Sequence, residues 1–307
     1  MHSAGSSQQL KLVVILSLGL VCVSSGSILV RLSQEAPSLA IAFFRMFGAS
    51  LLLSPMYWLN RPAKTISSWP LQLLAGCALA LHFAFWIASL RFTSVAVSVL
   101  LVNTSPALVA VFSYLFLGER LTRKGVFGLI CSFLGGAILM WNDVIQFGDW
   151  RGSLLALLGA VMLSIYLLGG RKLRQDTSLT GYIYPTYLTA ALLLTAIVIF
   201  TQTPILGFSW KTYFFLALLG LVPQCIGHTC YNWALRFLSA TLVSTIILGE
   251  PVLATLLAWW ILSETIGPVV LLGACLVGIG IFAVSRWGIV TPPPKMAPTA
   301  SVEKGTK

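Results

Sequence analysis

The chain has 307 residues, of which 58% are hydrophobic and 9% are charged, and its mean hydropathy is +0.93. Because a soluble domain carries about 25% charged residues, this composition excludes an ordinary soluble protein and predicts a polytopic membrane protein. The net charge of +11 would suggest nucleic-acid binding in a soluble protein. Here we interpret the basic residues as loop residues that set orientation in the membrane. We therefore expect the lipid bilayer and a small-molecule substrate as partners, and no nucleic acid.

Ten segments are long and apolar enough to cross a bilayer, which takes about 20 residues each. In chain order they lie at 12–30, 39–59, 69–90, 94–117, 124–142, 152–170, 179–201, 211–235, 240–262 and 267–286. The first resembles a secretory signal, but its apolar character continues to Val30 and no A-x-A site follows, so we predict a helix. The tail from Thr291 is rich in proline and polar residues, which predicts disorder.

An internal repeat relates the two halves of the chain. Residues 82–138 align without a gap on residues 227–283 at an offset of 145, and residues near the first and sixth segments align at an offset of 140. The most informative identities pair Arg31 with Arg171, Arg91 with Arg236, Pro106 with Pro251 and Glu119 with Glu264. Five predicted crossings separate the copies, and because five is odd the second copy is inverted. The predicted fold is therefore all-α, with ten transmembrane helices in a 5+5 inverted repeat, as in many carriers.

The distribution of basic residues predicts the orientation and the domain organisation. With both termini cytoplasmic, fourteen of the nineteen Lys and Arg residues lie on the inner side, four lie on the outer side, and Arg45 lies within a span. This asymmetry favours an inner-membrane protein with both termini in the cytoplasm. The expected regions are a cytoplasmic N-terminus (1–11), two five-helix repeats (12–142 and 152–286) and a disordered cytoplasmic tail (287–307).

Polar motifs interrupt the apolar segments in both halves. In the second half they are the run Gly227-His228-x-x-Tyr231-Asn232-Trp233-Ala234-Leu235-Arg236, the run Leu248-Gly249-Glu250-Pro251-Val252, and Glu264; in the first half they are Phe44-Arg45, Asn103-x-x-Pro106 and Leu117-Gly118-Glu119. In these motifs the chain resembles the EamA-type carriers of the drug/metabolite transporter superfamily. The resemblance covers roughly residues 12–286. It implies a ten-helix inverted-repeat carrier, usually one that exports amino acids or other small metabolites, and it does not indicate the substrate.

Charged side chains are rare inside the predicted spans, where each costs about 2.5–3.5 kcal/mol on insertion scales. Glu250 lies near the middle of the ninth span. Pro251 follows it and has no amide hydrogen for the carbonyl of Ile247, which predicts a kink. Glu250 either forms a buried ion pair with Arg45 or contacts a substrate or proton directly, and an unrelated polar cluster is the third alternative.

Imidazole, aromatic and amide groups extend the candidate substrate site. Trp86 lies four residues after His82, and Tyr231 lies three residues after His228, so each pair shares a helix face. The predicted substrate-binding residues are His82, Trp86, Asn103, Tyr166, Gln224, His228, Tyr231, Asn232 and Glu250. Ordinary helix packing and hydrogen bonds between helices are the alternative for all of them.

Two carboxylates are gate candidates. Glu119 and Glu264 lie at opposite edges of the membrane in the predicted topology. Each could pair with a nearby basic residue and so latch one mouth of a carrier. A loop base close in sequence, Arg123, is the expected partner for Glu119.

Catalytic and metal-binding motifs are absent from the sequence. It contains no H-E-x-x-H, no G-x-S-x-G and no phosphate-binding Gly-Lys loop. Its six cysteines form no C-x-x-C pair. We therefore expect no enzyme activity, no cofactor and no metal. The predicted function is secondary active export of small organic metabolites such as amino acids. A multidrug or cation efflux carrier and a facilitative uniporter remain alternatives, and a monomer and a homodimer are both compatible with the sequence.

Overall fold

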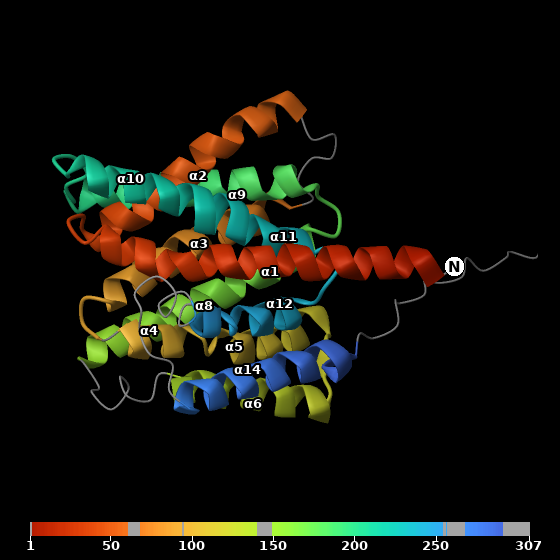
Figure 1. Cartoon of the computed structure of the whole chain (residues 1–307). Helices are drawn as coiled ribbons and strands as arrows, with labels where there is room; N and C mark the ends of the chain where they lie inside the picture. Colours follow the sequence, from red (N-terminus) through yellow and green to blue (C-terminus); the bar gives the residue numbers. More distant parts are fainter. Residues whose placement is uncertain are drawn as a thin grey trace, which may run out of the picture.

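The structure is a computed structural model that describes residues 2–60, 68–93, 95–139, 149–253, 256 and 268–290. These residues are mostly helical, and most of the long helices have roughly parallel axes (Figure 1). Within this part of the chain, seven helices are long and apolar enough to cross a membrane. Two shorter apolar helices span Ala240–Leu253 and Leu271–Trp287. The protein is therefore a polytopic all-α membrane protein.

The elements follow the ten predicted segments, and all of these segments contain helix. The first half holds α1 (His2–Leu32), α2 (Ser38–Asn60), α3 (Trp69–Ser89), α4 (Val95–Val102), α5 (Ser105–Phe112), the π-helix η1 (Ser113–Leu117), β1 (Arg120–Leu121) and α6 (Arg123–Leu139). The second half holds α8 (Trp150–Leu173), α9 (Leu179–Phe200), α10 (Trp210–Leu219), the π-helix η2 (Gly220–His228), α11 (Thr229–Ala234), α12 (Ala240–Ile247), α14 (Pro268–Trp287) and β2 (Ile289–Val290). The helix α1 begins ten residues before the predicted apolar segment. The predicted disordered tail, 287–307, is ordered at its start, because Trp287 ends α14 and Ile289–Val290 form β2. The rest of the tail, from residue 291, lies outside the described residues.

Prolines interrupt the helices at related places in the two halves. Between α4 and α5 the chain turns at residues 103–104, and Pro106 lies in the first turn of α5. In the second half α12 ends at Ile247, and Pro251 follows a turn at residues 248–249. A proline removes one intrahelical hydrogen bond and clashes with the preceding turn. The interruption predicted at Pro251 is therefore present, and a matching one lies before Pro106.

The most extensive contacts between helices are made in pairs. The most extensive packing of α3 is on α8, and that of α2 is on α9, while α6 and α14 form a pair of their own (Figure 1). Gly135 of α6 lies so close to α14 that a Cβ atom there would be 2.6 Å from the carbonyl oxygen of Gly273. A small residue at this position therefore allows the two helices to approach closely. The strands β1 and β2 join the neighbouring ends of this pair in an antiparallel ladder.

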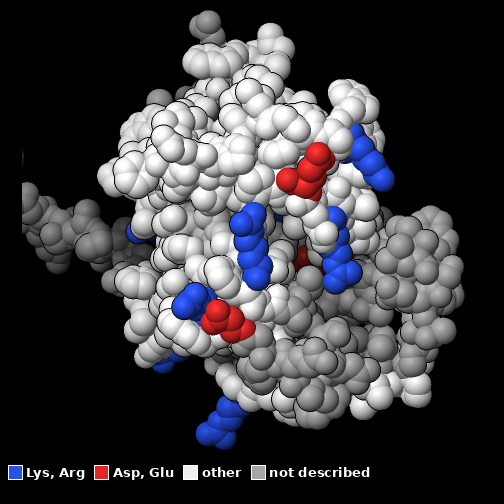
Figure 2. Space-filling view, turned by 90° about the vertical axis from the view of Figure 1, so that its left-hand side faces the viewer, with Lys and Arg blue, Asp and Glu red and all other residues white. Residues whose placement is uncertain are grey.

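The end of the molecule opposite the N-terminus is formed by the turns after α1, α3 and α9. Figure 2 views this end directly, and basic side chains there flank a hollow in the surface. We call it the far end, and the opposite end, where α8 finishes, the near end.

Candidate functional site

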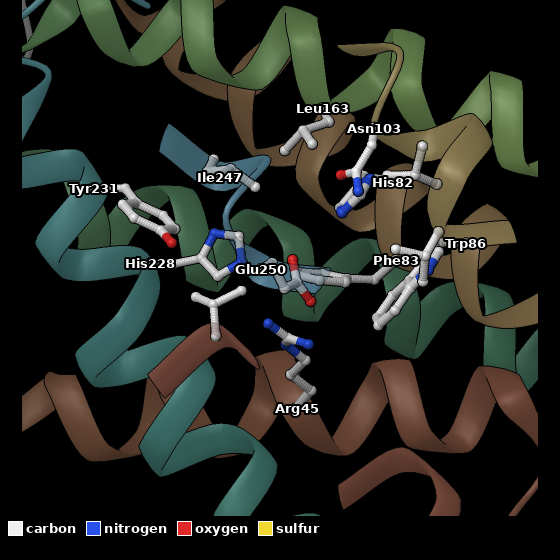
Figure 3. Close-up of a pocket in the computed structure, with 13 residues that line it drawn as sticks. Arg45, His82, Phe83, Trp86, Asn103, Leu163, His228, Tyr231, Ile247 and Glu250 are labelled. Atoms are coloured by element: carbon white, nitrogen blue, oxygen red, sulfur yellow. The ribbon is translucent and has the colours of Figure 1, made fainter. Parts of the chain in front are cut away.

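A cavity lies among the helices of both halves. It holds about 530 Å³ of space outside protein atoms, part of it open to solvent. Seven residues singled out in the sequence line it, namely Arg45, His82, Trp86, Asn103, His228, Tyr231 and Glu250 (Figure 3). The remaining lining residues are the apolar side chains Val23, Phe83, Val99, Val102, Leu163 and Ile247. The cavity therefore combines a few polar groups with apolar walls, as small-molecule sites do.

Arg45 is held in place by groups beside the cavity. Its Nε donates to Oε1 of Gln224 at 2.9 Å, and its guanidinium carbon lies 4.0 Å from the centroid of the Phe83 ring. The residue is only 2% exposed. A guanidinium over an aromatic face gains a cation–π attraction. The position of this charge is therefore set by two side chains other than Glu250.

Glu250 faces Arg45 across the cavity (Figure 3). No ion pair within 4.0 Å joins the two among the residues that the structure describes. The carboxylate stands where the helix resumes after the turn at residues 248–249, so the chain break explains its position. A positive and a negative group thus face the same cavity without contacting each other. A ligand with charges of both signs would match that arrangement.

The two histidines have different surroundings. The Nδ1 atom of His82 donates to the carbonyl of Gly159 at 2.9 Å, which leaves Nε2 as the acceptor in the neutral ring. The His82 ring is nearly parallel to that of Trp86, with centroids 6.3 Å apart. His228 instead packs edge-on against Phe83, at 5.5 Å between centroids. Both imidazoles therefore belong to one aromatic wall, on which Phe83 lies between them.

Three of the predicted site residues lie behind the cavity wall. Gln224 holds Arg45, as described above. Asn232 donates from Nδ2 to the hydroxyl of Tyr166 at 2.6 Å and to that of Tyr187 at 3.3 Å. Tyr166, Gln224 and Asn232 are buried and are not among the lining residues. In this structure they support the wall from behind.

Two polar atoms in the cavity wall have no hydrogen-bond partner among the described residues. They are Nδ2 of Asn103 and the hydroxyl oxygen of Tyr231, both buried. A buried donor without a partner costs about 1–3 kcal/mol. Both side chains line the cavity, so a solute or water within it could accept these hydrogen bonds.

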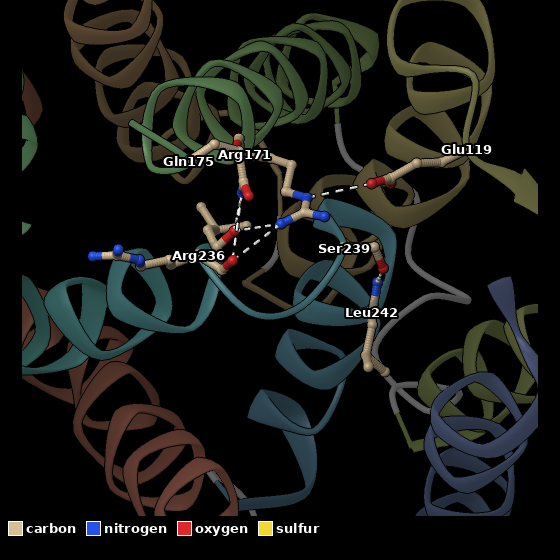
Figure 4. Close-up of polar contacts among 7 residues, drawn as sticks. Glu119, Arg171, Gln175, Arg236, Ser239 and Leu242 are labelled. Atoms are coloured by element: carbon tan, nitrogen blue, oxygen red, sulfur yellow. Dashed lines mark hydrogen bonds and ion pairs between the residues drawn. The ribbon is translucent and has the colours of Figure 1, made fainter. Parts of the chain in front are cut away.

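At the near end, Glu119 is bound by an arginine that is distant in sequence. Its Oε1 lies 3.3 Å from Nε of Arg171, which lies in the last turn of α8 (Figure 4). The same guanidinium donates from Nη1 to the carbonyls of Leu235 at 3.0 Å and Arg236 at 3.4 Å. The prediction that Arg123 would be the partner of Glu119 was wrong.

The reason is local backbone geometry. Gly118 adopts a left-handed conformation with φ of 70°. This ends the preceding π-helix and directs the next residue toward α8. The second gate candidate, Glu264, lies outside the described residues.

At the far end, a carboxylate that the sequence analysis did not single out joins two loops. Oε2 of Glu35 accepts from the amide of Ser209 at 3.0 Å, from its hydroxyl at 2.7 Å and from the hydroxyl of Thr212 at 2.6 Å. These bonds hold the pKa of Glu35 below its usual value, chiefly through the hydrogen bond from Thr212. The contact connects the turn after α1 to the first turn of α10, where a negative charge is favoured.

Sequence reasoning also missed Phe83 and Tyr187, and it noted Arg171 only as the repeat counterpart of Arg31. Phe83 aligns with His228 in the repeat, and this alignment was a usable signal for a position facing the cavity. Tyr187 carries no such signal, and the repeat does not reveal that Arg171 contacts Glu119. Their roles depend on which helices are neighbours, and the pattern of apolar residues does not reveal that.

Comparison with known proteins places this architecture in a family. The family model for EamA-like transporters matches residues 10–141 and 150–286. The chain therefore belongs to the EamA-like transporter family, a family of the drug/metabolite transporter superfamily.

Curated relatives and a solved structure agree with this membership. An uncharacterized transporter of Clostridium kluyveri is 26% identical over 269 residues, covering 83% of this chain and 86% of the relative. The pseudopaline exporter CntI of Pseudomonas aeruginosa is 26% identical over 259 residues, covering 83% of this chain and 88% of the relative. A chain of known crystal structure superposes with a TM-score of 0.78 at 18% identity, covering 90% of this chain and 96% of the other. The protein is therefore a membrane transporter with the same overall fold as that structure.

Proposed function

We propose that this transporter is a secondary active exporter of small organic metabolites, amino acids among them, which works by alternating access. The observation that carries the proposal is the central cavity, where Arg45 and Glu250 face each other without forming an ion pair. An amino acid carries a carboxylate and an ammonium group close together. In the proposed complex Arg45 binds the carboxylate and Glu250 binds the ammonium group.

The aromatic wall accounts for the rest of such a solute. His82, Trp86, His228 and Tyr231 surround the charged pair. They present flat apolar faces and a few polar atoms, which suits a solute with an apolar body. Asn103 supplies a donor that has no protein partner in the described structure. Tyr166, Gln224 and Asn232 act in this proposal by positioning the residues that contact the solute.

We propose that ten transmembrane helices form a 5+5 inverted repeat around this cavity. The repeats are residues 12–142 and 152–286, preceded by a cytoplasmic segment at 1–11 and followed by a cytoplasmic tail at 287–307. Both termini then lie in the cytoplasm, with the protein in the plasma (inner) membrane. The repeated sequence pairs and the matching interruptions before Pro106 and Pro251 support this arrangement.

Glu119 and Glu264 are the proposed gate residues of the two mouths. Glu119 in its contact with Arg171 would keep the near end closed. For Glu264 the proposal rests on the sequence repeat alone, which pairs it with Glu119.

Efflux from proteoliposomes tests the transport proposal. Vesicles containing the purified protein are loaded with a mixture of amino acids and other metabolites, and the external medium is followed by mass spectrometry. We expect time-dependent release of one or a few solutes beyond release from protein-free vesicles. The variants Arg45→Gln and Glu250→Gln should abolish that release, whereas Arg123→Gln, a surface change in α6, should not. No release of any solute above the protein-free level would overturn the proposal.

A pH gradient separates the alternatives. An exporter coupled to protons should release its solute faster or slower when a gradient is imposed, and a facilitative uniporter should not respond. A multidrug or cation efflux carrier is favoured by one observation, the carboxylate of Glu250 beside an aromatic wall. In that case vesicles should release ethidium, and the loss of Glu250 should affect transport far more than the loss of Arg45. Either a monomer or a homodimer is compatible with the proposed function, so the efflux assay can be run on whichever form is purified.

A further inference from the structure

A second cavity lies at the far end, outside the central one. It holds about 770 Å³ of space outside protein atoms, part of it open to solvent. Its walls come from the ends of α1, α2 and α3 and the turns that follow α1 and α3. We call this cavity the vestibule. Two arginines on different elements, Arg31 and Arg91, both line it.

The vestibule and the central cavity follow the same three helices. On α1 the lining moves from Val23 in the central cavity to Val30 in the vestibule. Seven residues of helix correspond to a rise of about 10 Å. On α2 the lining moves from Arg45 to Ile41 in the same direction. The two cavities are therefore successive compartments along one face of these helices.

Among the residues that the structure describes, the arginines of the vestibule have no acidic partner. None of the nine residues that line the vestibule is an aspartate or a glutamate. Among the described residues, the side chain of Arg31 makes no ion pair or hydrogen bond, and the side chain of Arg91 makes one hydrogen bond, from Nε to the hydroxyl of Ser38 at 3.0 Å. That bond orients the Arg91 guanidinium and leaves its two terminal nitrogens without a described acceptor. Arg151 at the same end differs, since Asp149 lies 3.8 Å from it.

The nearest carboxylate in sequence is directed elsewhere. Glu35 lies four residues after Arg31, yet it accepts three hydrogen bonds from Ser209 and Thr212. It is also not among the residues that line the vestibule. The positive charge of the vestibule is therefore not neutralised by the carboxylate closest to it in the chain.

We propose that the vestibule is a second binding site, in which Arg31 and Arg91 together hold a carboxylate or phosphate group. Two guanidiniums present several donors in fixed planes, a geometry that matches the oxygens of these anions. The anion is either part of a solute passing between the vestibule and the central cavity or part of a lipid headgroup. Only the first source rests on the transport function proposed above.

Protection from chemical modification tests this site without requiring transport. Purified full-length protein in detergent is treated with phenylglyoxal, and the modification of each arginine is followed by mass spectrometry. We expect citrate or inorganic phosphate to slow modification of Arg31 and Arg91 several-fold more than sodium chloride of equal ionic strength does. Arg286, in the last turn of α14, is the internal control and should react at the same rate in all three salts.

Two variants make the test specific. In Arg31→Gln, the protection of Arg91 by citrate should disappear, because one guanidinium alone is a weak oxyanion site in water. In the matched variant Arg151→Gln, the protection should remain. Equal rates in citrate, phosphate and chloride, or full protection of Arg91 in Arg31→Gln, would overturn the proposal.

Vesicles distinguish the two sources of the anion. The wild-type protein is placed in phosphatidylcholine vesicles and in vesicles that also contain phosphatidylglycerol. Protection by phosphatidylglycerol without any soluble anion assigns the site to a lipid headgroup. Protection by citrate in pure phosphatidylcholine, with none from phosphatidylglycerol, assigns it to a soluble anion. Failure of the efflux assay would leave either result standing, so the two proposals are tested separately.

Discussion

The two ends of the molecule carry related arginines in different circumstances. Arg171 and Arg31 occupy equivalent positions of the sequence repeat. At the near end, Arg171 binds Glu119 and two backbone carbonyls. At the far end, Arg31 lines an open cavity and has no partner among the described residues. Residues related by a repeat therefore need not share contacts.

The largest effect on stability is expected from removing the ion pair between Arg171 and Glu119 at the near end. Arg171→Ala leaves the carboxylate of Glu119, which is only 8% exposed, without its positive partner. Breaking a buried pair from one side costs about 3–5 kcal/mol. We expect a loss of about 3 kcal/mol here, because Arg171 is partly exposed. Thermal unfolding in detergent measures the change.

The control for this prediction is a double variant. Adding Glu119→Gln to Arg171→Ala should recover part of the lost stability, because no unpaired charge then remains. Arg123→Ala should leave the stability nearly unchanged. A larger loss in Arg123→Ala than in Arg171→Ala would show that the wrong arginine has been assigned.

A smaller and pH-dependent effect is expected at the far end, where Glu35 joins two loops. Its pKa is lowered in the folded protein, so the carboxylate stabilises the fold above its unfolded pKa. That contribution is lost as the pH falls through the lowered folded pKa. The variant Glu35→Gln should therefore unfold at a lower temperature than the wild type near neutral pH, and the difference should shrink under acidic conditions.

A difference between Glu35→Gln and the wild type that grows on acidification would contradict the assignment. The variant Glu35→Asp keeps the charge and shortens the side chain, which tests whether the reach to Ser209 matters. We expect it to unfold between the other two.

The smallest effect on stability is expected from Arg31→Gln. This side chain contacts no described acceptor, and surface substitutions of that kind change stability by about 0.5 kcal/mol or less. The comparison with Arg171→Ala thus sets two repeat-related positions against each other in one assay. Comparable destabilisation by both variants would remove the contrast between the two ends.

The sequence was sufficient to predict the class of fold, because transmembrane helices can be identified from their length and hydropathy. The interruption at Pro251 was also predictable, since it follows from the missing amide hydrogen of one residue. The position of Gln224 and Asn232 behind the cavity wall could not be predicted from the sequence. A polar residue in a span bonds either to a solute or to a neighbouring helix, and only the neighbour's identity decides.

The partner of Glu119 shows the same limit. Arg123 is four residues away in the chain, while Arg171 is on another helix and reaches Glu119 through the turn at Gly118. Proximity in sequence favoured the wrong residue. The carboxylate of Glu35 was overlooked for a similar reason, because its partners at Ser209 and Thr212 lie 174 and 177 residues away.

The pairing of α6 with α14 has a consequence for biogenesis. Synthesis of α6 is complete at Leu139, whereas its partner begins at Pro268, so more than a hundred residues must be inserted before the two helices can meet. Until then the face of α6 that contains Gly135 lacks the helix on which it packs in the folded protein. The strands β1 and β2 also join the first half to residues 289–290, at the end of the described chain. Assembly of the pair is therefore a late step, and truncation before α14 would leave that face of α6 exposed to lipid or to the membrane quality-control machinery.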